Sequence, residues 1–325
     1  MRFFLAFLGR RLGQGLLLAA AISLLVFSLL DLAPGDFLTN VRLNPQISPE
    51  TYDSLRTAYG LDQRFPTRYL RWVRSLARGE WGYSFSFNAP VAPLIWGRAG
   101  NTLLLTITAA SLTWLIAIPW GVWTASSRKR WPGRLLGACT SILVTLPDLA
   151  LALGLLLVAV HTRRLPAGGM VSLDFNKLTP AAKVWDLVRH MLLPVASLIL
   201  TALPLTLRHT YSSVREVMGA PFIQAARGHG IAESTVLFRY ALPVAAKPLI
   251  SLAGLSFAGL LSSSLLVEIV MSWPGLGPML WQAILARDTY LVMGLVMAST
   301  LFLATGNILA DVFLYLVDPR IRPEV

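Results

Sequence analysis

The sequence predicts an all-α, polytopic membrane protein with six transmembrane helices and a helical external segment between the first two. Hydrophobic residues make up 55% of its 325 residues and charged residues only 14%, with a mean hydropathy of +0.62. Soluble domains carry about 25% charged residues. Several charge-free stretches reach the roughly 20 residues that cross about 30 Å of hydrocarbon, and such unbroken stretches exclude the short alternating strands of a membrane barrel.

The apolar stretches place the six spans. They are expected at residues 12–30, 101–127, 135–160, 190–207, 249–267 and 289–310. A secretory signal is the alternative for the first stretch, because basic residues precede it, but no small-residue cleavage site follows. Prolines within the spans remove backbone hydrogen bonds, so each marks either a bend or ordinary packing. These prolines are Pro119, Pro147, Pro194 and Pro204.

The longest connection, residues 31–98, is a polar segment of 68 residues. One helix is expected to begin at Ser48-Pro49 and another at Pro66, because proline suits the first turn of a helix. The second helix has an apolar face among several arginines, and this face contains Tyr69, Leu70, Val73 and Leu76. Basic amphipathic helices lie on membrane or protein surfaces. The segment is therefore either a scaffold at the external mouth or a surface that receives a substrate-delivering protein.

Basic residues in the connections indicate the orientation. Six spans put both termini on one side, where the short segments hold 14 Lys and Arg against 6 on the other side. Residues 31–98 are left out of this comparison, because the positive-inside rule applies to short loops. Both termini are therefore expected in the cytoplasm. The expected organisation is an N-terminus with the first span (1–30), the external segment (31–98) and a core domain of five spans (99–325).

Residues 211–248 lie between two apolar spans yet carry six charged side chains and one histidine. Pro221 can begin a helix, because the first turn needs no amide donor. Gly228 and Gly230 can end that helix and supply a left-handed turn, after which a second amphipathic piece follows. The helical face expected to meet a partner contains Phe222, Ala225 and Ala226. This pattern predicts a helix–turn–helix docking element on the cytoplasmic side.

The spacing within this stretch resembles a known motif. Gln224-Ala225-Ala226 precedes Gly230 by three residues, and Leu242-Pro243 follows after eleven more. This is similar to the E-A-A-x3-G-x9-I-x-L-P loop of binding-protein-dependent ABC importer permeases, with Gln224 in place of Glu and Tyr240 in place of Ile. The resemblance implies coupling to an ATPase subunit through Pro221, Phe222, Gln224, Ala225, Ala226, Arg227, Gly228, Gly230, Leu242 and Pro243. A salt bridge is not expected at Gln224.

Other segments resemble the dipeptide, oligopeptide and nickel branch of these permeases. They are Ala33-Pro34-Gly35-Asp36 and residues 59–62, 79–85, 268–277, 287–288 and 318–320. The resemblance implies the type I ABC importer permease fold in a bacterial-type inner membrane. It also implies a second homologous permease, two nucleotide-binding subunits that hold ATP and magnesium, and an extracytoplasmic solute-binding protein. The chain itself is expected to bind no cofactor and to import peptides as one half of the pathway.

Few polar residues are candidates for the pathway. Asp148 lies near the middle of the third span, where a carboxylate costs roughly 2.5–3.5 kcal/mol on insertion scales, so it should face a cavity or a partner. It is either a pore-lining group that meets a peptide amine or a structural carboxylate beside Pro147. Glu268 and the turn Trp273-Pro274-Gly275 are expected at the external mouth, as either a gate or a tightly packed reversal.

Several function classes are disfavoured. The net charge of +12 is explained by basic cytoplasmic loops rather than by nucleic-acid binding. No Gly-x4-Gly-Lys-Ser/Thr phosphate loop is present, the four histidines are scattered, and Cys139 lies in an apolar run, so ATP binding, a metal site and catalysis are not expected. The alternatives are the same machine with nickel, a metal chelate, glutathione or an opine-like cargo, and an ion-coupled secondary transporter. The latter would show an internal repeat, and none is evident.

Overall fold

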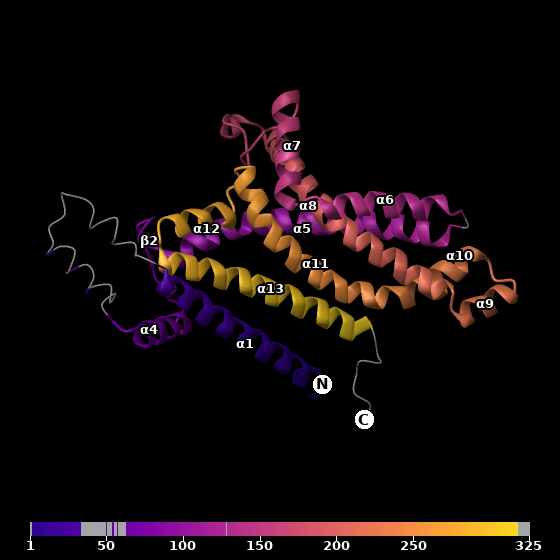
Figure 1. Ribbon diagram of the computed structural model, residues 1–325, viewed down its shortest axis with the longest axis horizontal. Helices are drawn as coiled ribbons and strands as arrows, with labels where there is room; N and C mark the ends of the chain where they lie inside the picture. Colours follow the sequence, from indigo (N-terminus) through magenta and orange to yellow (C-terminus); the bar gives the residue numbers. More distant parts are fainter. Residues whose placement is uncertain are drawn as a thin grey trace. The chain divides into compact units, whose positions relative to one another are not determined.

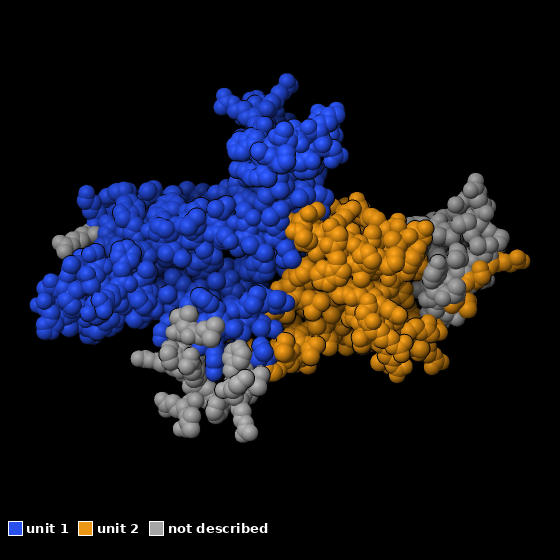
Figure 2. Space-filling model, turned by 180° about the vertical axis from the view of Figure 1, so that it is seen from behind, with its two compact units in different colours: residues 1–8, 102–274, 305–325 blue, residues 9–101, 275–304 orange. Residues whose placement is uncertain are grey.

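The computed structural model describes residues 2–33, 50, 54, 57, 63–127 and 129–317 (Figure 1). The helix expected at Ser48-Pro49 and the segments 34–36, 59–62 and 318–320 lie outside the described residues. The chain forms two compact units (Figure 2). One comprises residues 1–8, 102–274 and 305–325, here called the core unit, and the other comprises residues 9–101 and 275–304, here called the flank unit.

Helices dominate the described chain. The long ones are α1 (Arg2–Leu32), α5 (Val91–Ser126), α8 (Pro180–Met218), α11 (Leu242–Val270) and α13 (Thr289–Val317). The shorter ones are α4 (Phe65–Ala77), α6 (Trp131–Thr145), α7 (Asp148–Thr162), α9 (Pro221–Gly228), α10 (Glu233–Thr235) and α12 (Leu276–Leu285). A 3-10 turn (Phe175–Lys177), a π-helical turn (Val236–Ala241) and the strands β1 (Tyr83–Ser84) and β2 (Ala89–Pro90) complete the described elements.

Among the described helices, five are long and apolar enough to cross a membrane, and a sixth span results if α6 and α7 count as one. This confirms the predicted fold class. The helices extend beyond the expected spans: α8 has 39 residues, whereas only 190–207 were expected. Pro194 and Pro204 lie inside continuous α8, and Pro119 lies inside continuous α5. Prolines are tolerated within membrane helices because neighbouring groups satisfy the freed carbonyls.

The third span is not the single helix expected at 135–160. It is broken into α6 and α7, which meet at 96°. Leu146 is extended, with φ −86° and ψ 124°, and Pro147 has ψ 143°. The proline ring disfavours the helical region for the residue before it and removes an amide donor, so the helix ends at Thr145 and restarts at Asp148. Of the four prolines considered, Pro147 is therefore the one at which the helix is interrupted.

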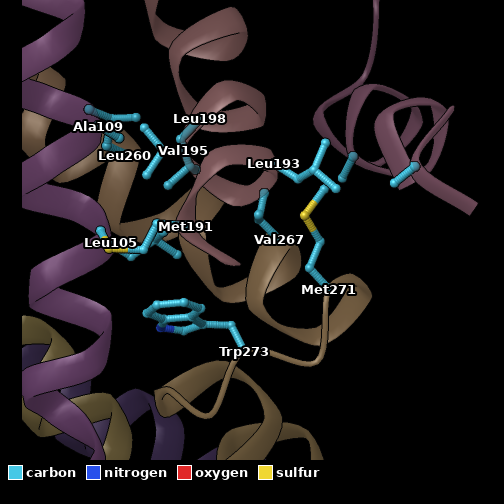
Figure 3. Packing of buried hydrophobic residues seen from close by; sticks show 12 residues of the cluster. Leu105, Ala109, Met191, Leu193, Val195, Leu198, Leu260, Val267, Met271 and Trp273 are labelled. Atoms are coloured by element: carbon cyan, nitrogen blue, oxygen red, sulfur yellow. The ribbon is translucent and has the colours of Figure 1, made fainter. Parts of the chain in front are cut away.

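The hydrophobic core of the core unit lies between α5, α7, α8 and α11 (Figure 3). Leu105, Met191 and Leu198 from two of these helices pack around Leu260 and Trp273. Outside this core the helices expose many large apolar side chains, as expected for surfaces in contact with lipid. Burial of Trp273, whose exposed fraction is 0%, anchors the turn that follows α11.

In the flank unit, α4 packs on α1 through a small aromatic cluster. Trp72 is the buried residue of α4, at 3% exposed, whereas Leu70 is 53% exposed. The apolar face predicted for this helix was therefore wrong at Leu70 and missed Trp72, because α4 turns Tyr69 and Trp72 toward Phe27 of α1. An ion pair of 2.9 Å between Arg68 and Asp31 closes the same contact.

A two-stranded hairpin in the flank unit was not predicted. Tyr83 pairs with Pro90 and Ser84 with Ala89 in antiparallel register. Two-residue strands are too short to leave a periodic signal in the sequence. The hairpin presents its turn to Asp288, the residue before α13.

Candidate coupling site

The predicted docking element is helical over most of its length. α9 runs from Pro221 to Gly228, with the proline at its start, and Gly230 takes φ +75° in the turn that follows. A side chain at Gly230 would be strained in this left-handed conformation, which explains glycine there. α8 reaches Met218 and α11 begins at Leu242, so the connection predicted as 211–248 is shorter and more helical than expected.

The two faces of α9 are clearly different. Ile223 is fully buried and Ala226 is 7% exposed, whereas Phe222 is 45% exposed. The expectation that Phe222, Ala225 and Ala226 share an outward face was wrong for Ala226, which packs inward with Ile223. Exposed residues of α9 and the turn are Pro221, Phe222, Gln224, Ala225, Arg227, Gly228, His229 and Gly230. Phe222 and Ala225, rather than Ala226, are therefore accessible on the outer face of α9.

The inward face of α9 belongs to a second hydrophobic cluster. Ile223 and Ala226 pack with Val214 of α8, Val236 and the end of α5. Leu242 is packed against the same cluster at the start of α11, and Pro243 beside it is exposed. Because well-packed interiors transmit displacement, a force on α9 reaches α5, α8 and α11 through this cluster.

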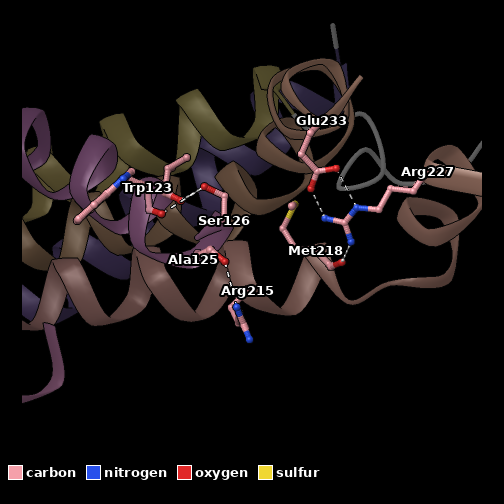
Figure 4. A network of polar contacts seen from close by, with 8 residues as sticks. Trp123, Ala125, Ser126, Arg215, Met218, Arg227 and Glu233 are labelled. Atoms are coloured by element: carbon pink, nitrogen blue, oxygen red, sulfur yellow. Dashed lines mark hydrogen bonds and ion pairs between the residues drawn. The ribbon is translucent and has the colours of Figure 1, made fainter. Parts of the chain in front are cut away.

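A bidentate ion pair ties α9 to α10 (Figure 4). Arg227 donates from Nε to Glu233 Oε2 at 3.1 Å and from Nη2 to Oε1 at 2.5 Å. The hydrogen bonds to Glu233 raise the pKa of Arg227 above its ordinary value. Arg215 donates to the carbonyl of Ala125 at 3.2 Å. Both arginines border a polar hollow of about 400 Å³ between α5, α8 and the turn after α9.

Gln224, which stands where the motif has Glu, has a role within the chain. Its Nε2 donates to the carbonyl of Gly219 at 3.2 Å. Gly219 is the C-cap residue that follows α8. A carboxylate could not donate to that carbonyl, so the amide suits this position better. The contact links α9 to the residue that caps the C-terminus of α8.

We expect reversal of one charge in the Arg227–Glu233 pair to loosen the turn between α9 and α10. Arg227→Glu places two carboxylates together, and we expect it to lower transport several-fold. Unfolding stability should change by less than about 1 kcal/mol, because exposed ion pairs contribute little. The double variant Arg227→Glu, Glu233→Arg should restore transport, measured as cargo uptake per milligram of complex. Equal loss in the single and double variants would contradict a role for the pair itself.

The structure separates the pathway candidates. Asp148 begins α7 at the break and accepts a hydrogen bond of 2.6 Å from Ser263 of α11. Glu268 is fully buried near the end of α11, and its carbonyl accepts the backbone N–H of Trp273 at 2.9 Å. Pro274 and Gly275 follow in the turn before α12. Burial of Trp273 favours the packed reversal, and a gating role for Glu268, Trp273, Pro274 and Gly275 stays a prediction.

One buried carboxylate was not singled out as a site from the sequence. Asp288 is fully buried and accepts from Ser84 Oγ at 2.7 Å, Ser86 Oγ at 2.7 Å and Ser86 N at 3.0 Å. Its other oxygen accepts from Leu291 N at 3.2 Å and so caps α13. An Asp immediately before an apolar helical run is an N-cap signal that could have identified it. Among the described residues, no group of three His, Cys, Asp or Glu could hold a metal ion.

Comparisons with known proteins agree with this arrangement. The family described as "Binding-protein-dependent transport system inner membrane component" matches residues 117–323. A putative peptide permease protein of Brucella ovis is 32% identical, with 96% of each chain covered. The oligopeptide transport system permease protein AppB of Bacillus subtilis is 30% identical, covering 98% of this chain and 99% of that protein. The dipeptide transport system permease protein DppB of Escherichia coli K12 is 31% identical with the same coverage.

A solved structure shows the same fold. The MetNI methionine ABC transporter, in an inward-facing conformation, contains a chain that aligns with a TM-score of 0.56 and 18% identity. The alignment covers 70% of this chain and 99% of that one. The expected type I importer permease fold is thus confirmed. From these matches and its apolar helices, this chain belongs to the binding-protein-dependent transport system inner membrane components, as a multi-pass transport permease subunit.

Proposed function

We propose that this chain forms one half of the translocation pathway of an ATP-driven importer of di- or oligopeptides. Relatives of similar length and about 30% identity are named for dipeptide or oligopeptide transport, which supports a peptide cargo. Family membership favours this machine over an ion-coupled carrier. The partners are a second homologous permease, two ATPase subunits that bind ATP and magnesium, and an extracytoplasmic solute-binding protein.

The observation that carries the coupling part of the proposal is the two-sided α9. Its outer face carries Phe222 and Ala225, and its inner face is locked to α5, α8 and α11 by Ile223 and Ala226. A short helix held this way acts as a rigid lever. When ATP closes the two ATPase subunits, the groove that holds α9 moves, and the attached spans tilt as rigid bodies to give alternating access.

The same proposal includes the topology. With both termini and α9 in the cytoplasm, the short basic segments lie on the cytoplasmic side, as the positive-inside rule requires. Residues 31–98 and 161–189 then face the external side, where the solute-binding protein docks. The division into 1–30, 31–98 and 99–325 describes these roles along the sequence.

Isolation of the assembled importer tests this function. We expect Phe222→Asp to abolish co-isolation of the ATPase subunits, and with it ATP-dependent peptide uptake, because a charge replaces the apolar anchor of the outer face. Leu173→Asp is a matched control: this residue is fully exposed in the opposite connection, so the ATPase should still co-isolate. Purification of the wild-type chain without any ATPase, or ATPase retention by Phe222→Asp, would contradict the proposed coupling site.

A further inference from the structure

A cavity of about 290 Å³ opens between the middle of α8 and the middle of α11, within the core unit. Its lining is mostly aliphatic, but four of the lining residues carry a hydroxyl group: Thr201, Thr206, Ser256 and Ser263. Thr206 donates to its own helix at Ala202, and Ser256 donates to Ala253. A mostly apolar hollow with a few placed polar groups is the usual form of a small-molecule site.

One of these hydroxyl groups has no partner in the described structure. The Oγ1 atom of Thr201 is buried and makes no hydrogen bond among the described residues. A buried polar atom left unsatisfied costs roughly 1–3 kcal/mol, so most such atoms meet a partner in some functional state. Thr201 is also one of the residues that line the cavity, so rotation of its hydroxyl group toward an occupant would satisfy this buried polar atom.

The cavity is linked to a carboxylate at the broken span through one of its lining residues. Ser263, one of its lining residues, donates to Asp148 Oδ2 at 2.6 Å. Among the described residues, no Lys, Arg or His forms an ion pair with Asp148. Irregular backbone at membrane depth is tolerated where it lines a cavity or is buried in protein, and broken helices in transporters place their ends at substrate sites. The 96° break beside Asp148 is such a feature.

We propose that Asp148, Ser263 and Thr201 form a transient subsite for the ammonium group at the amino terminus of a peptide in transit, an inference that rests on the proposed peptide import. An ammonium group has three N–H donors and no acceptor. The carboxylate of Asp148 and the two hydroxyl oxygens supply three acceptors, and the carboxylate supplies the opposite charge. The aliphatic wall accommodates the first side chain. A divalent metal fits poorly, because no group of three His, Cys, Asp or Glu in the described chain could hold one.

The size of the site suits the amino-terminal residue of a peptide rather than a whole peptide. A volume of about 290 Å³ lies at the lower limit of small-molecule sites. A subsite that recognises only the terminal amine tolerates any sequence behind it. Such a contact orients the cargo with its amino terminus toward α7 and α8 and releases it readily, because few contacts hold it.

The test compares two cargoes in the complete importer, reconstituted with its binding protein. One is a tripeptide with a free amino terminus and the other is its des-amino analogue. We expect Asp148→Asn to slow uptake of the free-amine peptide about tenfold, as for loss of one charge-assisted contact, and uptake of the analogue less than about twofold. Ser263→Ala and Thr201→Val should act in the same selective way but more weakly.

Ser262→Ala is the matched control, since Ser262 is exposed and donates only to Ala258 of its own helix at 3.3 Å. We expect it to transport both cargoes as the wild type does. A second readout is binding of the radiolabelled free-amine peptide to the detergent-solubilised complex, which should be weaker for Asp148→Asn than for Ser262→Ala. This readout does not depend on delivery of the analogue.

The outcomes separate this subsite from the function on which it rests. If Asp148→Asn slows uptake of both cargoes equally, or slows uptake of neither, the proposed subsite is wrong. Peptide import itself would be unaffected by that result. Loss of the second permease from the purified Asp148→Asn or Thr201→Val complex would also overturn the subsite, because the cavity would then be an intersubunit contact. If the wild-type importer takes up no peptide of any kind, the proposed cargo itself is wrong.

Discussion

Replacement of Ile223 by Asp is expected to abolish transport and to unfold the coupling segment locally. Ile223 of α9 is fully buried in the cluster that α9 forms with α5, α8 and the start of α11. Deletion of a buried isoleucine side chain costs about 2–5 kcal/mol, and a buried, unpaired carboxylate adds several more. These costs exceed what a short helix such as α9 can recover, so the segment should detach from the cluster. Limited proteolysis in inverted membrane vesicles should then cleave within 219–241, where the wild type resists.

The neighbouring residue provides the control for this prediction. Phe222→Asp introduces the same charge one position away, on the exposed face of α9. On the proposed function, both variants lose uptake, but only Ile223→Asp should become sensitive to protease. If both variants resist cleavage equally, Ile223 is not held in the cluster as described. If both are cleaved, the outer face of α9 also packs within the chain.

Removal of the Asp288 carboxylate is expected to have the second large effect. Asp288→Ala deprives Ser84 Oγ, Ser86 Oγ and Ser86 N of their acceptor and removes the cap of α13. Loss of the acceptor costs about 1–3 kcal/mol for the buried Ser84 Oγ and less for each donor of Ser86, which is exposed, and the lost cap costs about 1 kcal/mol. Because water can reach some of these donors once the hairpin loosens, we expect a loss of about 3–5 kcal/mol in the free energy of unfolding of the flank unit.

Thermal unfolding of the purified chain in detergent measures this loss. Asp288→Asn retains one acceptor oxygen and should fall between wild type and Asp288→Ala. Asp174→Ala is the control, because Asp174 is an exposed residue whose ion pair with Lys177 lies in solvent. We expect the control to change stability by less than about 1 kcal/mol. An Asp288→Ala protein as stable as the control would show that the hairpin does not depend on this carboxylate.

The site could be predicted in part. The spacing from Gln224 to Pro243 was enough to locate the coupling segment, and Pro221 and Gly230 were enough to predict where α9 begins and turns. The sequence did not predict which side of α9 faces outward. By spacing alone, Phe222, Ala225 and Ala226 could all lie on one face of the helix. The packing of Ile223 against Val214 and Val236 decided the rotation of the helix. Isoleucine in this cluster buries more apolar area than Ala225 would.

The other features that the sequence did not predict have related causes. Asp288 depends on Ser84 and Ser86, which are about 200 positions away in the sequence and leave no local signal. The cavity at Thr201 is formed by two helices that are distant in sequence, and its lining residues are ordinary components of apolar runs. The break at Pro147 had a local cause, but no local pattern gives its 96° angle, and both α6 and α7 contact α8, which lies further along the chain.

By itself the sequence determined that the chain is a bundle of membrane helices and where the coupling segment lies. It could do so because lipid demands long apolar stretches whose backbone bonds are satisfied internally, and because the motif is local. Only the tertiary structure decided which face of α9 is free, which carboxylates are buried, and which hydroxyl groups share a cavity. These depend on contacts between segments far apart in the chain, and no local pattern encodes such contacts.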